Sequence, residues 1–319
     1  MDNFANIHGQ DLAIQILNSA ISKEHISTAY LFSGPEGVGR KKTAKIFIKT
    51  ILDKNLAKEN TKRKIESNNH PDLLWIKPSY IIQGKSISQE KAKSENISMK
   101  SPPQIRLNQI KEIIEFLGKK PFESEHSIVI IEDIEKMNES AANALLKTLE
   151  EPNSGLFILI TQRPEKLLST IRSRCQIVPF IRLNNNEVNR IIQKLDIVEE
   201  INEIPSENIQ ELIAFSDGSP GRYLTNLQYW LDISNELRQK LEIKLTNKIE
   251  LLKLAKDITD DLNIEQQLWF ISFQQNMFWE NENNSHMVRK LENLRKQLLT
   301  YVQPRLAWEV TLLEINFSN

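Results

Sequence analysis

The chain has 319 residues, 40% of them hydrophobic and 26% charged, with a formal net charge of −1; this length and apolar content allow two or three domains with buried cores. The near-neutral charge excludes a polycation that binds nucleic acid over its whole surface, and the single cysteine, Cys175, excludes an intrachain disulfide or a zinc site of several cysteines. The apolar runs are too short to cross a membrane and residues 1–10 do not resemble a secretion signal, so we expect a cytoplasmic protein with no membrane partner.

The first 180 residues alternate predicted strands and helices. Apolar residues recur at helical spacing over residues 13–21, and a short strand over residues 28–33 then leads into a glycine-rich loop. Further apolar strands are predicted at residues 73–76, 128–131 and 156–160, with helical patterns at residues 107–117 and 142–149. Apolar strands without strict alternation, separated by helices, indicate an α/β fold with a parallel sheet covered on both faces.

Two other stretches differ in character. Residues 79–101 are polar and lack periodicity, which predicts a mobile surface insertion. Strand patterns end after about Phe180, and the chain from Asn184 onward is predicted to be helical, with a turn at residues 216–221. An aromatic-rich group is predicted to pack between helices: Trp269, Phe270, Phe273, Met277, Phe278 and Trp279.

The loop GPEGVGRKKT, residues 34–43, resembles a phosphate-binding P-loop, G-x-x-x-x-G-K-[S/T]. Gly34 and Gly39 have the required spacing, but Arg40 stands where the phosphate-binding lysine belongs and Lys41 where the magnesium-binding hydroxyl belongs. The hydroxyl of Thr43 lies two residues further on, about 200° around a helix, so it points away from that position. The loop is therefore either a disabled nucleotide site or a turn with no ligand.

A pair of acids follows the apolar strand IVII at residues 128–131. An ATPase uses two acids at a strand end, one for magnesium and one to orient water, usually in the order Asp-Glu, whereas this chain has Glu132-Asp133. The inversion moves each carboxylate by about 1 Å, and misplacement of this size can cost about a hundredfold in rate. Alone, the pair also fits a solvated strand end; together with the altered loop it indicates a damaged nucleotide site.

Several long strings in the chain resemble the AAA+ clamp-loader family of bacterial DNA polymerase III. They are MNESAANALLKTLEEP at residues 137–152, FILITQRPEKLLSTIRSRCQ at 157–176, NHPDLLWIKP at 69–78, DGSPGRYL at 217–224 and VQPRLAWEVTLLE at 302–314. Motor subunits of the family have an intact P-loop and a four-cysteine zinc knuckle, and this chain has neither. It is more similar to the family's non-motor subunits with a disabled loop.

The resemblance implies three domains. An AAA+ nucleotide-binding-like α/β module with a RecA-like parallel sheet would span residues 1–181, a small helical lid residues 182–230, and an all-helical collar that joins the subunits residues 231–319. His70, Pro71 and Asp72 resemble the family's HPD turn, and we assign them a turn role because one histidine offers too few ligands for a metal.

The resemblance also implies roles for individual residues. Thr161 falls at the polar sensor position and Arg222 in the lid arginine region, although each also fits a structural role. Lys147 and Asn138 lie on or beside the helix that follows the DNA backbone in clamp loaders, and the basic residues of the insertion, from Lys85 to Lys100, are a further DNA candidate. Arg174, in the string Ser-Arg-Cys, matches an arginine finger that enters the neighbouring subunit's nucleotide site; pairing with acids at a subunit contact is the alternative.

We therefore expect a non-motor clamp-loader subunit that helps to load a sliding clamp onto primed DNA. Its implied partners are the motor (gamma/tau) and clamp-opening (delta) subunits, with the clamp contacted indirectly and DNA through the assembled complex. We expect no required cofactor and no metal, with residual ATP or ADP binding left open. The alternatives are an active AAA+ ATPase motor subunit with a variant P-loop and a DNA-binding module that needs no nucleotide.

Overall fold

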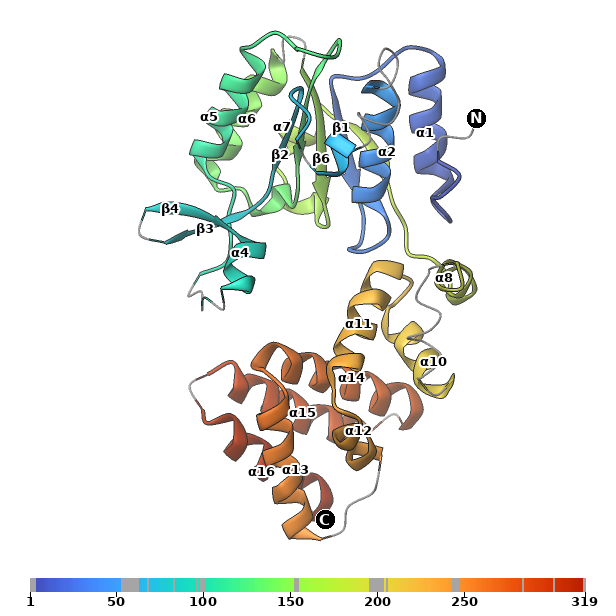
Figure 1. The fold of residues 1–319 in the computed structure, drawn as a ribbon, viewed down its shortest axis with the longest axis vertical. Helices are drawn as coiled ribbons and strands as arrows, with labels where there is room; N and C mark the ends of the chain where they lie inside the picture. Colours follow the sequence, from blue (N-terminus) through green and yellow to red (C-terminus); the bar gives the residue numbers. More distant parts are fainter. Residues whose placement is uncertain are drawn as a thin grey trace. The chain divides into compact units, whose positions relative to one another are not determined.

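The computed structural model describes residues 4–52, 63–67, 69–82, 84–95, 97, 101–151, 155–194, 204, 206–242, 247–282, 284–300 and 302–317. It divides the chain into two compact units. The first comprises residues 1–191 with 218–221, and the second comprises residues 192–217 with 222–319. Figure 1 shows a sheet with its helices in the first unit and helices in the second.

The first unit contains a parallel sheet of five strands in the order β2-β5-β6-β1-β7. Its strands are β1 (Ala29–Ser33), β2 (Leu73–Ile76), β5 (Ser127–Ile131), β6 (Gly155–Thr161) and β7 (Gln176–Pro179). The predicted parallel sheet and its first four strands are confirmed. Strand β7 was not predicted, because four residues that begin with glutamine and end with proline show no apolar run; pairing with β1 makes them a strand.

Helices cover both faces of this sheet (Figure 1). Helices α1 (Asp11–Ser22) and α2 (Arg40–Leu52) pack on one face, and α5 (Leu107–Leu117), α6 (Glu139–Glu150) and α7 (Ser169–Arg172) on the other. Successive strand residues point to opposite faces, so Tyr30 and Phe32 join the first core while Leu31 joins the second. Both faces are apolar, which explains why the strand sequences do not alternate with polar residues.

The stretch predicted as an irregular insertion contains regular structure. Strands β3 (Ser79–Ile82) and β4 (Lys85–Ser88) form an antiparallel hairpin, followed by helix α4 (Gln89–Ser94). Gly84 occupies the turn with a positive φ of 78°, a conformation that glycine adopts without steric cost. The regular structure was missed because the two paired strands are only four residues long and mix polar with apolar residues; the predicted mobility stays a prediction. Residues 83, 96 and 98–100 lie outside the described residues, and with them Lys100 of the predicted DNA-contacting stretch.

Described helices make up the second unit, as predicted. They are α10 (Ser206–Phe215), most of α11 (Pro220–Asp232), α12 (Asn235–Glu242), α13 (Lys248–Asp261), α14 (Ile264–Glu282), α15 (Ser285–Leu298) and α16 (Pro304–Phe317), while α8 (Asn185–Ile192) ends at the boundary of the first unit. Helix α10 packs against α14. The predicted division at residues 181 and 230 stays a prediction, because helices assigned to the lid share a compact unit with those assigned to the collar.

The aromatic group of α14 is largely a packing cluster. The rings of Trp269 and Phe273 stack with centroids 5.5 Å apart, and the Trp269 indole donates a hydrogen bond of 3.0 Å to Asn226 on α11. Phe270 and Phe273 are buried, which confirms the predicted packing role for these two residues. Trp279, in the last turn of α14, is 53% exposed, so the prediction was wrong for this residue.

Within the described part of the chain, no helix has both the length and the apolar content needed to cross a membrane.

Candidate functional site

The P-loop-like turn, the acid pair and Thr161 meet at the carboxyl edge of the sheet. Strands β1, β5 and β6 are adjacent and parallel, and Ser33 at the end of β1 is paired with Thr161 at the end of β6. The Gly34 amide, which opens the loop, donates a hydrogen bond of 3.2 Å to the Thr161 carbonyl. The structure thus brings together residues that are up to 127 positions apart, taken from Gly34 to Thr161, at the edge where parallel α/β folds bind ligands.

The loop backbone needs glycine at its first position and is hydrogen-bonded to a second segment. A Cβ atom on Gly34 would lie 2.3 Å from the Phe180 carbonyl oxygen, which excludes any side chain there. Ser219 donates its hydroxyl to the Glu36 carbonyl at 2.6 Å, and the Gly221 amide donates to the Gly37 carbonyl at 2.9 Å. The Ser-Pro-Gly segment of residues 219–221 therefore fixes the middle of the loop.

Arg40, at the first position of α2, is buried where a P-loop has its lysine. Its side chain is 5% exposed, and Nη1 has no hydrogen-bond partner among the described residues. Burial lowers the pKa of the guanidinium below its usual range, while the nearby carboxylates of Asp133 and Glu135 act in the opposite direction. Arg40 is thus a positive charge held inside the site by packing and by the acids around it.

Lys41 is paired with the first acid of the predicted magnesium site. Its ammonium forms an ion pair with Oε2 of Glu132, whose other oxygen accepts a hydrogen bond of 2.5 Å from the Trp75 indole. Glu132 is 5% exposed. Both of its oxygens are therefore occupied by side chains of this chain.

The second acid and the sensor position are also engaged. Asp133 has a positive φ of 47°. Its carboxylate forms a salt bridge of 2.8 Å with the Lys136 ammonium. Thr161 is fully buried and donates its hydroxyl to Glu135 at 2.8 Å, while the same oxygen accepts the Arg163 amide at 3.0 Å. Sequence reasoning missed Glu135; its position three residues after Glu132, on the short 3-10 helix η1 (Ile134–Lys136), becomes informative only when β5 and β6 are adjacent.

These residues do not fit a magnesium nucleotide. Magnesium needs oxygen ligands, yet an ammonium stands at the hydroxyl position and is paired with the adjacent carboxylate. The second carboxylate is paired with Lys136, and the Thr161 hydroxyl donates to Glu135. Thr43 donates its hydroxyl to the Gly39 carbonyl at 3.0 Å, inside α2, and is fully buried.

Arg174 lies at the opposite edge of the sheet. It precedes β7, whose first residue, Gln176, pairs with Tyr30 near the start of β1. Because all five strands are parallel, the amino edge with Arg174 and the carboxyl edge with the P-loop are separated by the length of β1, about 16 Å at 3.3 Å per residue.

The Arg174 guanidinium is held by two acceptors. Nη1 donates to the Thr170 carbonyl at 2.9 Å, and Nη2 donates to Oε1 of Glu150 at 2.5 Å. Its side chain is 34% exposed. Arg172, two residues earlier, is exposed and forms no ion pair in the part of the chain that the structure describes.

Comparison with known families decides the identity of the chain. A family model described as DNA polymerase III, delta subunit, matches residues 9–184, and one described as Cyanobacterial DNA polymerase III delta prime, C-terminal domain, matches residues 186–315. The chain belongs to the delta-prime family of DNA polymerase III subunits.

Two individual relatives are named delta', and a third is named tau. The chain is 35% identical over 193 residues to DNA polymerase III subunit delta' of Bacillus subtilis (strain 168), a match covering 58% of this chain and 52% of the relative. It is 29% identical over 202 residues to subunit delta' of Pseudomonas aeruginosa, covering 60% of this chain and 53% of that protein. Subunit tau of Bacillus subtilis is 27% identical over 268 residues, covering 81% of this chain and 43% of tau. The chain thus spans about half the length of these relatives.

In this delta-prime family member, Arg222 belongs to the second unit. It lies in the first turns of α11, and its Nη1 atom is 3.8 Å from the Asp217 carboxylate. Asp217 and Gly218 both have positive φ, so this turn orients the start of the helix. A ligand role for Arg222 stays a prediction.

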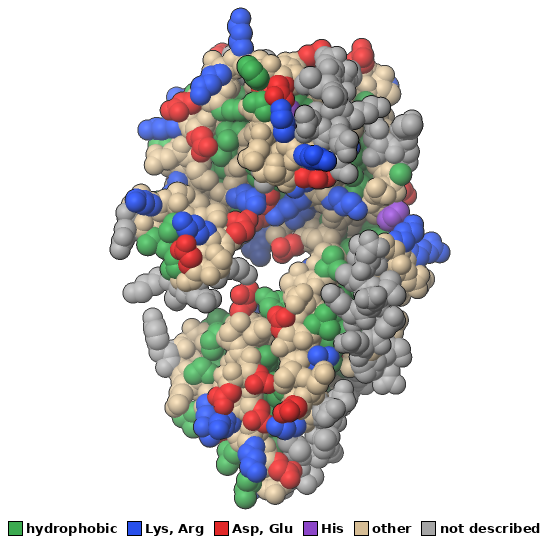
Figure 2. Space-filling view, viewed as in Figure 1, with side chains coloured by type: hydrophobic (Ala, Val, Ile, Leu, Met, Phe, Trp, Pro, Cys, Tyr) green, Lys and Arg blue, Asp and Glu red, His purple; other side chains and the backbone are tan. Residues whose placement is uncertain are grey.

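The predicted DNA residues lie on different sides of α6. Asn138 caps the helix, its side-chain oxygen accepting the Ala141 amide at 2.9 Å, whereas Lys147 is nine residues further along, about 180° around the axis. Ser140, Asn143 and Lys147 share one exposed face of α6 by their helical spacing. Figure 2 shows basic and acidic side chains interspersed on the face that it presents.

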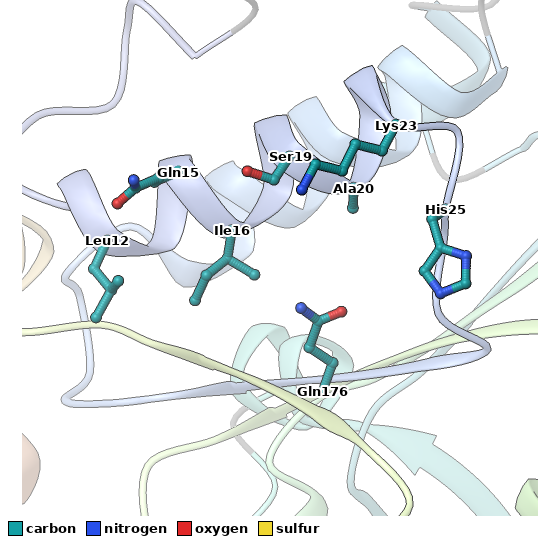
Figure 3. A pocket seen from close by; sticks show the side chains of 8 residues that line it. All are labelled: Leu12, Gln15, Ile16, Ser19, Ala20, Lys23, His25 and Gln176. Carbon is teal, nitrogen blue, oxygen red and sulfur yellow. The ribbon is translucent and has the colours of Figure 1, made fainter.

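A pocket of about 380 Å³ lies between α1 and the start of β7, near the amino edge (Figure 3). Leu12, Ile16 and Ala20 of α1 form its apolar wall, and Lys23, His25 and Gln176 add polar groups. The Gln176 side chain accepts the Ser27 hydroxyl at 2.8 Å. No predicted site residue lines this pocket.

The predicted turn role of His70 and Asp72 is supported by their contacts. The Asp72 carboxylate accepts the amides of Phe122, Glu123 and Ser124 at 2.6 to 2.8 Å, and the Ser124 hydroxyl at 2.9 Å. His70 is buried and its Nδ1 atom accepts the Asp72 amide at 3.1 Å. The pair therefore joins the segments that precede β2 and β5.

Proposed function

We propose that this chain is the non-motor subunit of a clamp loader and supplies Arg174 in trans to the nucleotide site of a neighbouring motor subunit. The partners in this proposal are the motor (gamma/tau) and clamp-opening (delta) subunits, and the assembly loads a sliding clamp onto primed DNA in the cytoplasm. Membership of the delta-prime family and similarity to proteins named delta' and tau support it.

The position of Arg174 carries the proposal. The residue is partly exposed at the amino edge of the sheet, whereas the P-loop of the same chain lies at the carboxyl edge. With the length of a strand between them, Arg174 is badly placed to serve its own loop and well placed to serve another subunit.

The chain's own loop supports a non-motor role. Phosphoryl transfer requires magnesium between the β- and γ-phosphates and an oriented nucleophile. Here both acids at the end of β5 are paired with lysines, and the Thr161 hydroxyl is donated to Glu135. We therefore propose that the subunit needs no nucleotide of its own. Residual binding of ATP or ADP by Arg40 and the loop backbone, without turnover, is compatible with this proposal.

A guanidinium acts on a transferring phosphoryl group by electrostatics and geometry. The charge that develops on the phosphate oxygens is stabilised by a forked pair of N–H donors, and such arginines contribute roughly 10³ to 10⁵ in rate. Lysine keeps the charge but not the fork.

The test is a reconstituted complex carrying Arg174→Ala, Arg174→Lys or Arg172→Ala. We expect all three complexes to assemble, both Arg174 variants to depress DNA-stimulated ATP turnover and clamp loading, and Arg172→Ala to behave as the unaltered complex does. Normal turnover with Arg174→Lys would contradict the proposal. Loss of assembly with Arg174→Ala would instead favour a structural ion pair at the subunit contact.

A motor subunit is the second candidate, because the similarity to tau covers 81% of this chain. Turnover by the purified chain distinguishes the two. We expect none, whereas DNA-stimulated turnover near 1 s⁻¹, about the low end for phosphoryl-transfer enzymes, would favour the motor. Tight DNA binding without partners would favour a nucleotide-independent DNA-binding module.

A further inference from the structure

We propose that Glu150 is the positioning residue for Arg174, holding the guanidinium in the orientation in which it enters the neighbouring subunit's site. The inference rests on the proposed trans role of Arg174. It assigns a function to an acid that the sequence does not distinguish from its neighbour Glu151.

The two anchors of Arg174 come from different elements. Nη2 donates to Glu150, the last residue of α6, and Nη1 donates to the carbonyl of Thr170 in α7. Binding at two of its nitrogens restricts both the rotation of a planar guanidinium about its own axis and its swing away from the edge. Loss of the Glu150 contact would leave it attached at Nη1 alone.

The contact leaves part of the guanidinium available. Arginine has five N–H donors in a fixed fork, and the structure records two hydrogen bonds from Arg174 within the residues that it describes. The side chain remains 34% exposed. The other donors can therefore meet an anion supplied from outside the chain while Glu150 stays bound.

The surroundings of the pair indicate orientation rather than stability as its role. Glu150 is 52% exposed, and exposed ion pairs add little to folding stability. The helices that carry both anchors are nevertheless fixed by packing, because Leu145 and Leu149 of α6 and Ile171 of α7 are buried in the same core. A side chain held by rigid helices is placed more accurately than one on a free loop.

A competing role for Glu150 predicts the opposite effect of its removal on ATP turnover. If the carboxylate restrained the arginine until a phosphate displaced it, removing the carboxylate would accelerate turnover. Positioning predicts a loss of turnover instead, so one series of variants separates the two roles.

The experiment compares Glu150→Ala, Glu150→Gln and Glu151→Ala in the reconstituted complex, with assembly checked by gel filtration. Glu151→Ala is the matched control, because Glu151 is the next residue, is also exposed, and forms no ion pair in the described structure. For Glu150→Ala we expect assembly and the KM for ATP to be unchanged and kcat to fall by about 10- to 100-fold, since displacement by about 1 Å can cost a hundredfold. Glu150→Gln keeps an acceptor oxygen and should recover part of the rate, and Glu151→Ala should leave it unaltered.

Adding Glu150→Ala to Arg174→Ala completes the test. Because a positioning residue acts through its partner, the double variant should be no slower than Arg174→Ala alone. Equal rates for Glu150→Ala and Glu151→Ala, faster turnover, loss of assembly, or additive losses would each overturn the inference while leaving the role of Arg174 intact. Unaltered turnover with Arg174→Ala would overturn the proposed function and this inference together.

Discussion

Lys41 in the first turn of α2 forms an ion pair with Glu132 at the end of β5. The lysine stands where a P-loop has its magnesium-binding hydroxyl, and the glutamate stands where an ATPase has its magnesium-binding acid. The Lys41 side chain is 57% exposed, and its ammonium bridges the loop helix and the central sheet from the surface. The pair replaces a ligand-dependent contact with one that the chain makes by itself.

Lys41→Ala should destabilise the first unit by about 1–3 kcal/mol, the usual cost of leaving a buried polar group without its partner. Glu132 is 5% exposed and would keep only the Trp75 hydrogen bond. Denaturant unfolding checks the value, with Lys49→Ala as the control, since Lys49 lies on the same helix and forms no ion pair in the described structure. Equal stability of the two variants would mean that the pair is not a structural contact.

Asp72→Asn should destabilise the chain by about 2 kcal/mol at pH 7, because the carboxylate accepts hydrogen bonds that are stronger for a charged acceptor. Burial alone would raise the pKa of Asp72, but the amides of Phe122, Glu123 and Ser124 with the Ser124 hydroxyl overcome it and lower the pKa. The stabilisation is therefore present above the ordinary value of 3.8 and lost as pH falls through the folded value. Urea unfolding of the parent chain and of Asp72→Asn, at pH 7 and in acid, should show a difference in unfolding free energy that becomes smaller at low pH.

Stability should decrease as pH falls below about 6.5, partly because of His70. Burial lowers the pKa of this imidazole, although Asp72 and Glu123 oppose the effect. Since the folded chain disfavours the protonated form, the unfolded chain takes up more protons as pH falls through the ordinary value of 6.5. His70→Asn keeps an acceptor near Nδ1 and removes the titration, so its unfolding free energy should change less between pH 7.5 and 5.5 than that of the parent chain. His286→Asn, at an exposed histidine, serves as the control, and its unfolding free energy should change with pH as that of the parent chain does.

A chain truncated after Trp230 should keep a folded first unit and fail to join the complex. The truncation removes the α14 partners of α11, including the Phe273 ring 5.5 Å from Trp230 and the Trp269 indole bonded to Asn226. Hydrogen exchange should show protected amides in the sheet and faster exchange in α10 and α11. Co-elution of the truncated chain with its partners in gel filtration would contradict the collar assignment.

Local pattern accounts for much of the fold. The apolar runs that became β1, β2, β5 and β6 are visible in the sequence because strands buried on both faces need apolar residues at successive positions. Strand β7 and the β3–β4 hairpin were missed because their strands are only four residues long and partly polar. Strand β7 also depends on pairing with the distant strand β1.

The candidate site was predictable to a similar extent. Spacing and composition identified Arg40, Lys41, Glu132 and Asp133 as departures from a working P-loop. They did not indicate that Lys41 would pair with Glu132, since this contact depends on where α2 meets the end of β5. Glu135 went unnoticed for the same reason, because it contacts Thr161 on a neighbouring strand.

The sequence by itself determined the strand–loop–helix order, the loss of the P-loop lysine and hydroxyl, and the presence of an arginine after a short helix. Only the tertiary structure decided that the P-loop and Arg174 lie at opposite edges of one parallel sheet and that Glu150, 24 residues before Arg174, holds its guanidinium. Residue type and spacing are local properties of the chain. Which edge a residue occupies and which partner it meets depend on strand order and helix packing, which arise from contacts between segments far apart in sequence.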